Sequence, residues 1–159
     1  MSAIDVVSDA NVALKWFHAE GEEEVSEARA LLDAHRSRDL GVAILDLTLY
    51  EIGNALMQGR AGASAEQAAI VLDALGEVCA TVSPDPADFR RATELAEQHA
   101  LTLYDATYAA VAEGHEAELA TLDRALLRAG LGVRPGDLAK KYGRYRRRRR
   151  WLREWSRGT

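Results

Sequence analysis

Short apolar segments alternate with amphipathic helical segments along the whole chain. The segments typical of strands are residues 4–8 (IDVVS), 41–45 (GVAIL), 79–83 and 118–122 (ELATL), with a short extended piece at 101–104. Helical spacing of apolar residues predicts helices over 22–36, 49–58, 65–78, 87–99, 105–115 and 123–130, with a first helical turn after residue 9. Strands that alternate with helices predict a parallel sheet of the α/β class, with helices on both faces.

Two helix ends carry recognisable capping signals. Thr48 is predicted to cap the helix 49–58, with Glu51 three residues later as in a capping box. Gly130 is predicted to close the last helix of the alternating series.

Charge divides the chain near residue 140. The 159 residues carry 20 Lys and Arg against 25 Asp and Glu, a net charge of −5. Residues 140–159 hold ten basic residues and one acidic residue, a net charge of +9, whereas residues 1–139 hold ten basic and 24 acidic residues, a net charge of −14. The length and the charge pattern predict one globular domain over 1–139 and an Arg-rich C-terminal extension over 140–159.

The cysteine content and the first residues point to a reducing compartment. Cys79 is the only cysteine, so no internal disulfide can form, and no His/Cys cluster offers a zinc site. Asp5 and Asp9 stand where a signal peptide needs basic residues and then an apolar run, and no segment has the roughly 18 apolar residues of a membrane span. We expect a cytoplasmic protein with no membrane association.

Acidic residues follow several of the predicted strands and helix starts. Asp9 follows the first strand, Asp105 follows the extended piece, and Asp123 follows the fourth strand. Glu51 lies in the first turns of the helix after the second strand, with Asn54 one turn later. Because the carboxyl ends of parallel strands meet at one edge of a sheet, we expect the four carboxylates to face the same place.

Each acid alone has a structural explanation. Asp105 and Asp123 stand at helix starts, where Asp is a favoured N-cap, and Glu51 fits a capping box or a solvated helix face. Together, four carboxylates at one edge repel one another unless a cation neutralises them. Oxygen ligands without His or Cys suit Mg²⁺ or Mn²⁺, which support phosphate-ester hydrolysis by activating water.

Four motifs resemble those of the PIN-domain nucleases, and most closely the VapC-like ribonuclease toxins of prokaryotic toxin–antitoxin pairs. They are VVSDANVALKW, LYEIGNAL, LTLYDATYAA and LATLDRALL, and the resemblance covers residues 4 to about 139. It implies a PIN-like three-layer α/β/α fold with a central parallel sheet of four to five short strands. The chain departs from many relatives at Leu126–Leu127, where they carry an aromatic residue, and the segment after Tyr142 lies outside the family core.

The resemblance also implies a site and partners. Asp9, Glu51, Asp105 and Asp123 match the metal-binding and catalytic acids of the family, and the supporting polar residues are Asn11, Asn54 and Thr121. Family members cut RNA with Mg²⁺ or Mn²⁺, are usually homodimers, and are silenced by a cognate antitoxin. The chain is therefore expected to be a metal-dependent endoribonuclease and the toxin of a VapBC-type pair.

Basic residues give a separate, weaker set of expectations. Arg124 adjoins Asp123 and is the best placed basic residue of the body for RNA contact. The extension adds dense arginine and aromatic residues, which suit phosphate neutralisation and base stacking; its candidate RNA-binding residues are Arg146, Arg147, Arg148, Arg149 and Arg150. The alternatives are that the extension docks on its own acidic body or a partner, or that it has no role.

The residues also bear on two other classes of protein. A non-catalytic PIN-like domain that binds RNA or protein would be favoured by loss of one of the four acids, and all four are present. An aspartate-phosphorylating enzyme is disfavoured because Asn11 stands where a haloacid-dehalogenase-type enzyme needs a second Asp.

Overall fold

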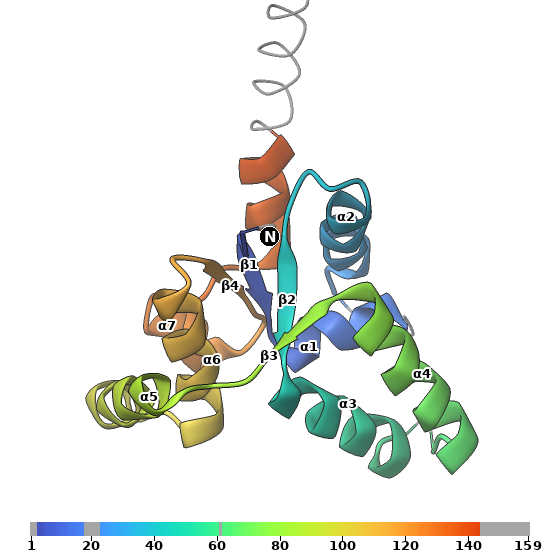
Figure 1. The fold of residues 1–159 in the computed structure, drawn as a ribbon, viewed down its shortest axis with the longest axis horizontal. Helices are drawn as coiled ribbons and strands as arrows, with labels where there is room; N and C mark the ends of the chain where they lie inside the picture. Colours follow the sequence, from blue (N-terminus) through green and yellow to red (C-terminus); the bar gives the residue numbers. More distant parts are fainter. Residues whose placement is uncertain (1–2, 18–22, 61, 144–159) are drawn as a thin grey trace, which may run out of the picture.

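A four-stranded parallel sheet forms the centre of the computed structural model, which describes residues 3–17, 23–60 and 62–143 (Figure 1). The strands are β1 (Val6–Ser8), β2 (Val42–Leu45), β3 (Ala80–Val82) and β4 (Glu118–Ala120), in the order β3-β2-β1-β4. Val6 pairs with Val42 and with Glu118, so β1 is central. A single parallel bridge between Ala120 and Val133 extends the sheet beyond β4. The expected parallel sheet of four to five short strands is confirmed.

Helices cover both faces of this sheet. The first group is α1 (Ala10–Ala13), the 3-10 turn η1 (Leu14–Trp16), α2 (Val25–Arg36), α3 (Asp46–Gln58) and α4 (Ala65–Val78). The second is α5 (Pro86–His99), α6 (Leu103–Gly114) and α7 (Arg124–Arg128), and residues 135–143 are also helical. Figure 1 shows α1 to α4 on one side of the strands and α5 to α7 on the other, as expected for three layers.

Alternation along the strands sends neighbouring side chains into two separate cores. Val6 and Ile44 pack with Trp16, Leu31 and Leu75 on the α1 to α4 side. On the other face, the residues that pack together include Val7, Leu45, Leu95, Tyr108, Val111, Leu119 and Leu126. Because consecutive strand residues point to opposite faces, the nearly unbroken apolar strands serve both layers.

The start of α3 corrects the capping prediction. The helix begins at Asp46 rather than at Leu49, with Leu45 as its N-cap residue. Thr48 therefore lies inside the first turn, where its hydroxyl accepts a hydrogen bond from the Leu45 backbone N–H at 3.1 Å. Glu51 is displaced to the second turn and takes no part in a capping box.

The start of α6 corrects a second prediction. The extended piece 101–104 ends at Thr102, and Leu103 already begins the helix. Thr102 caps it by accepting a hydrogen bond from the backbone N–H of Asp105 at 3.1 Å. Asp105 is thus the third residue of α6, not its cap.

No helix within the described ranges has the length and apolar character needed to cross a membrane.

Candidate active site

Asp9 is held at the carboxyl end of the central strand. It follows Ser8, the last residue of β1, and its backbone N–H donates to the carbonyl oxygen of Ala120 at 2.9 Å. Its extended backbone turns the chain from β1 into α1, and only 4% of the residue is exposed. Continuation of the sheet bonding therefore fixes this carboxylate at the edge predicted from the sequence.

Thr121 joins two of the acids through one hydroxyl group. Its Oγ1 donates to Asp9 Oδ2 at 2.7 Å and accepts from the backbone N–H of Asp123 at 3.0 Å. The residue is fully buried. Its hydroxyl therefore fixes the Asp9 carboxylate relative to the chain leaving β4.

Asp123 is the N-cap residue of α7, as expected for an Asp at a helix start. Its Oδ1 accepts from the backbone N–H groups of Ala125 at 2.9 Å and Leu126 at 3.0 Å. Both bonds end on the same oxygen, so the geometry is compatible with a second ligand on Oδ2.

Electrostatic effects couple the four acids across the site. Burial raises the pKa of Asp9 to about 6; the hydrogen bond from Thr121 opposes this shift, and the charges of Asp105 and Asp123 add to it. Burial, followed by the charges of Asp9 and Asp105, raises the pKa of Glu51 to about 7. Burial and then the charge of Asp123 also raise the pKa of Asp105. Each of the four acids thus takes part in at least one of these interactions, although they come from α3, α6 and two strand ends.

The donor chemistry fits a hard divalent cation, but the side chains do not yet enclose one. Within residues 3–17, 23–60 and 62–143, no three His, Cys, Asp or Glu side chains lie close enough to hold a metal ion together. The carboxylate oxygens are ligands that Mg²⁺ and Mn²⁺ accept, and a cation would relieve the repulsion that raises their pKa values. A shared ion would require the four side chains to come closer than they stand in this structure.

The supporting residues differ in their contacts. The Oδ1 atom of Asn11 accepts from the backbone N–H of Leu122 at 3.2 Å, which ties α1 to the segment after β4. Asn54 is exposed on α3, one turn beyond Glu51. Arg124 is exposed and lines a pocket of about 530 Å³ together with Asn11, Leu14, Lys15, Leu122 and Asp123. Arg146, Arg147, Arg148, Arg149 and Arg150 lie outside the described residues.

The sequence interpretation missed a buried hydroxyl pair beside the acids. Tyr108 on α6 and Thr48 on α3 form a hydrogen bond of 2.8 Å between their hydroxyl oxygens, and both residues are fully buried. Tyr108 lies three residues after Asp105, and Thr48 lies three residues before Glu51. That helical spacing was the available signal, because residues three apart share one helix face.

Asp46 shows that a position after a strand is not sufficient for a place in the acidic group. It directly follows β2, but its Oδ2 accepts from the Ser83 hydroxyl at 3.0 Å and its Oδ1 accepts from the Leu47 backbone N–H at 2.8 Å. Its charge is not among those that shift the pKa values of Asp9, Glu51 and Asp105.

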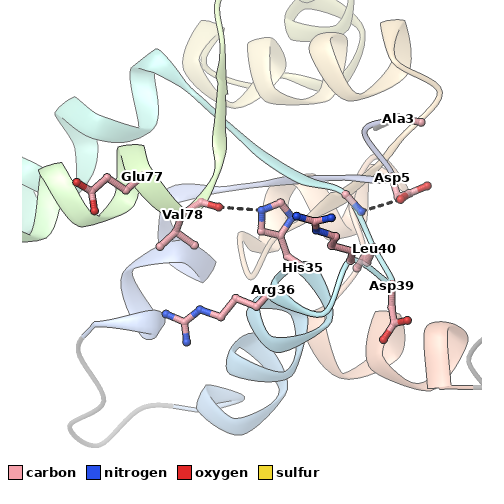
Figure 2. Close-up of a pocket in the computed structure, with 10 residues that line it drawn as sticks. Ala3, Asp5, His35, Arg36, Asp39, Leu40, Glu77 and Val78 are labelled. Atoms are coloured by element: carbon pink, nitrogen blue, oxygen red, sulfur yellow. Dashed lines mark hydrogen bonds between the residues drawn. The ribbon is translucent and has the colours of Figure 1, made fainter. Parts of the chain in front are cut away.

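A larger pocket, of about 780 Å³, lies where β1 and β2 begin, at the opposite edge of the sheet from the acids (Figure 2). His35 crosses it and accepts from the Val42 backbone N–H through Nδ1 at 3.0 Å. Its Nε2 lies 2.8 Å from the carbonyl oxygen of Val78, and Asp5 accepts from the Gly41 backbone N–H at 2.8 Å. These bonds join α2, β2 and the end of α4, so the pocket is a packing junction.

Comparison with solved structures places this fold among known ones. PAE2754 from Pyrobaculum aerophilum is 27% identical with a TM-score of 0.65, over 88% of this chain and 90% of that chain. A toxin–antitoxin complex from Klebsiella pneumoniae matches at 22% identity and a TM-score of 0.61, over 84% and 98%. The sarcin–ricin loop cleaving toxin VapC20 of Mycobacterium tuberculosis matches at 19% identity and a TM-score of 0.62, over 79% and 95%.

The family comparison covers most of the chain. A search of curated proteins finds no match. The sequence profile of the PIN domain matches residues 6–131, which span every strand of the sheet and all four acids. The chain therefore belongs to the PIN domain family.

Proposed function

We propose that this protein is a metal-dependent endoribonuclease whose site is formed by Asp9, Glu51, Asp105 and Asp123. The observation that carries the proposal is the set of raised pKa values at Asp9, Glu51 and Asp105, to which the charges of neighbouring acids contribute, at the carboxyl edge of a PIN-domain sheet. Carboxylates with raised pKa values in a shared site have a physical reason to bind a cation, because the cation removes their repulsion.

In the proposed reaction the acids, Thr121 and Arg124 have separate roles. The four carboxylates would hold Mg²⁺ or Mn²⁺, while Thr121 fixes the orientation of Asp9 through its 2.7 Å bond. When bound, the ion supplies the Lewis acidity that activates water and stabilises charge on the scissile phosphate. Arg124, which is exposed beside Asp123, would contact a phosphate of the RNA. No nucleophilic side chain is needed for this hydrolysis.

We further propose that the protein is the toxin of a VapBC-type pair. The support is fold similarity to a structure described as a toxin–antitoxin complex and to a toxin described as cleaving the sarcin–ricin loop. The expected partners are RNA, a cognate antitoxin and a second copy of the chain, and the expected location is the cytoplasm. An antitoxin that covers the acidic edge would block both metal and substrate.

One observation favours a second candidate, a non-catalytic PIN-like domain that binds RNA or protein. No three potential ligands converge among the described residues, as a preformed metal centre would require. The two functions differ in one measurable property: the nuclease needs the carboxylates for turnover, whereas the binding domain does not.

A cleavage assay separates the two functions. Purified protein should cut a labelled structured RNA in Mg²⁺ or Mn²⁺, and EDTA should stop the reaction. Asp9→Asn and Asp105→Asn should abolish cleavage while retaining the circular dichroism spectrum. Asp46→Asn is the matched control, because Asp46 is a strand-end carboxylate bonded to Ser83. Cleavage that persists in EDTA, or in both site variants, would exclude the proposed mechanism.

A further inference from the structure

The helices that carry Glu51 and Asp105 are joined by one hydrogen bond between buried side chains. The hydroxyls of Thr48 and Tyr108 lie 2.8 Å apart, and the two residues are 60 positions apart in the sequence. On α3 the bond lies one turn before Glu51, and on α6 it lies one turn after Asp105. The pair therefore connects the two helices close to their acids.

Both ends of this bond are held in place by the surrounding structure. Thr48 Oγ1 also accepts from the Leu45 backbone N–H at 3.1 Å, which anchors it to the end of β2. Tyr108 is fully buried in the core on the α5 to α7 side. The Tyr108 hydroxyl thus joins the helix that carries Asp105 to the helix that carries Glu51.

The electrostatic setting agrees with this placement. Burial raises the pKa of Tyr108; the hydrogen bond with Thr48 opposes the shift, and the charges of Glu51 and Asp9 add to it. The phenol therefore stays neutral at physiological pH, and both charges act on it directly. A neutral hydroxyl can bridge the helices without adding a charge to the acidic site.

We propose that the Thr48–Tyr108 pair is a positioning element that sets the separation of Glu51 and Asp105 and thereby controls metal binding. The inference rests on the proposed function, because it takes these acids as ligands of one metal site. Loss of the bond frees α3 to move relative to α6 while each helix keeps its own backbone bonds. Residues that orient metal ligands typically change metal affinity or activity by about 10- to 100-fold when mutated.

The test is Mn²⁺ binding by titration calorimetry of the full chain without RNA, followed by steady-state RNA cleavage. Tyr108→Phe should weaken Mn²⁺ binding and lower kcat, each by about 10- to 100-fold, with KM for RNA nearly unchanged. Thr48→Val removes the same bond from the other side, so the double variant should be no weaker than the weaker single variant. Thr48→Ser keeps the hydroxyl and should behave like the wild type.

Thr107→Val is the matched control on α6. The Thr107 hydroxyl is buried next to Tyr108, but it donates to the Leu103 carbonyl oxygen of its own helix at 2.6 Å. Its loss should leave Mn²⁺ binding and kcat near wild-type values. Wild-type Mn²⁺ affinity in Tyr108→Phe, additive effects in the double variant, or an equal effect of Thr107→Val would overturn the inference.

The same measurements distinguish failure of the proposed function from failure of the proposed role of Thr48 and Tyr108. A wild-type protein that binds Mn²⁺ without cleaving RNA would contradict the nuclease, and the calorimetric comparison would still decide the role of the hydroxyl pair. A wild-type protein that binds no Mn²⁺ would contradict both.

Discussion

Thr121 donates its hydroxyl hydrogen to Asp9 Oδ2 at 2.7 Å, and neither residue is more than 4% exposed. The Thr121 hydroxyl oxygen also accepts a hydrogen bond from the Asp123 backbone N–H. The bond that Thr121 donates to Asp9 favours the ionised form of Asp9, in opposition to burial, which favours the neutral form. The charge state of the site thus depends on a hydroxyl that is not itself proposed as a metal ligand.

Removal of that hydroxyl should weaken metal binding most strongly at low pH. In Thr121→Val the pKa of Asp9 should rise further, because burial and the charges of Asp105 and Asp123 would then act without the opposing bond. Mn²⁺ affinity at pH 6.5 should fall by about 10- to 100-fold, and part of the loss should be recovered at pH 8. Calorimetry at both pH values tests this. Thr121→Ser keeps the donor and should retain wild-type affinity; equal affinity in Thr121→Val would contradict the assigned role.

Neutralisation of Asp9 should stabilise the protein in EDTA. Because folding raises the pKa of Asp9 from 3.8 to about 6, its contribution to stability is fully present below pH 4 and is lost as the pH rises through 6. Asp9→Asn avoids that loss and keeps an oxygen to accept the Thr121 bond. The free energy of unfolding at pH 8 should increase by about 1 to 3 kcal/mol.

Urea unfolding in EDTA at pH 4 and pH 8 measures this effect. The gain should be small at pH 4 and large at pH 8. An Asp9→Asn protein that is less stable than the wild type at pH 8 would contradict the raised pKa assigned to Asp9.

RNA cleavage should rise with pH between about 5.5 and 8. Glu51, with a pKa of about 7, and Asp9, with a pKa of about 6, must both lose protons to bind a cation. A bound cation favours the ionised carboxylates, so the rise should move to lower pH as the Mn²⁺ concentration increases. Initial rates at limiting and saturating Mn²⁺ provide the measurement. A profile that is flat over this range at limiting Mn²⁺ would contradict the assigned ligands.

The Arg-rich extension should contribute to RNA affinity through phosphate contacts. Replacement of Arg146, Arg147, Arg148, Arg149 and Arg150 by Gln in the full chain should reduce the salt dependence of RNA binding. Each lost contact to single-stranded RNA lowers the slope of log K against log salt by about 0.7. Fluorescence anisotropy at several salt concentrations tests this, with Arg91→Gln as control because Arg91 pairs with Glu94 and Glu113. An unchanged slope would exclude an RNA-binding role for these arginines.

The sheet could be predicted from sequence because its strands are nearly uniformly apolar. Val42 to Leu45 are all buried, and the four parallel strands bring Asp9, Asp46 and the segment leading to Asp123 to one edge. The helix starts were harder to predict. At α3 the chain turns directly from Leu45 into the helix, and Thr48 bonds backward from inside the first turn. A Thr with a Glu three residues later fits both arrangements.

The other features that could not be predicted from the sequence depend on hydrogen bonds between residues far apart in the chain. The contact between Thr48 and Tyr108 joins residues that no local periodicity relates. The hydroxyl of Ser83 donates a hydrogen bond to Asp46, which lies outside the acidic group. The acids could be identified from their residue types and their positions in the sequence, but burial is the largest cause of their raised pKa values. Burial at Asp9 and Glu51 follows from how α1, α3 and α6 pack together, which only the structure provides.

The central claim is that Asp9, Glu51, Asp105 and Asp123 hold a common divalent cation. The anomalous difference map of a crystal grown in Mn²⁺ tests it most directly. We predict a peak between the four carboxylates, with side chains drawn closer together than in this structure, and no such peak in Asp9→Asn. A clear map with no peak at this edge of the sheet, or with Mn²⁺ bound only elsewhere, would contradict the account.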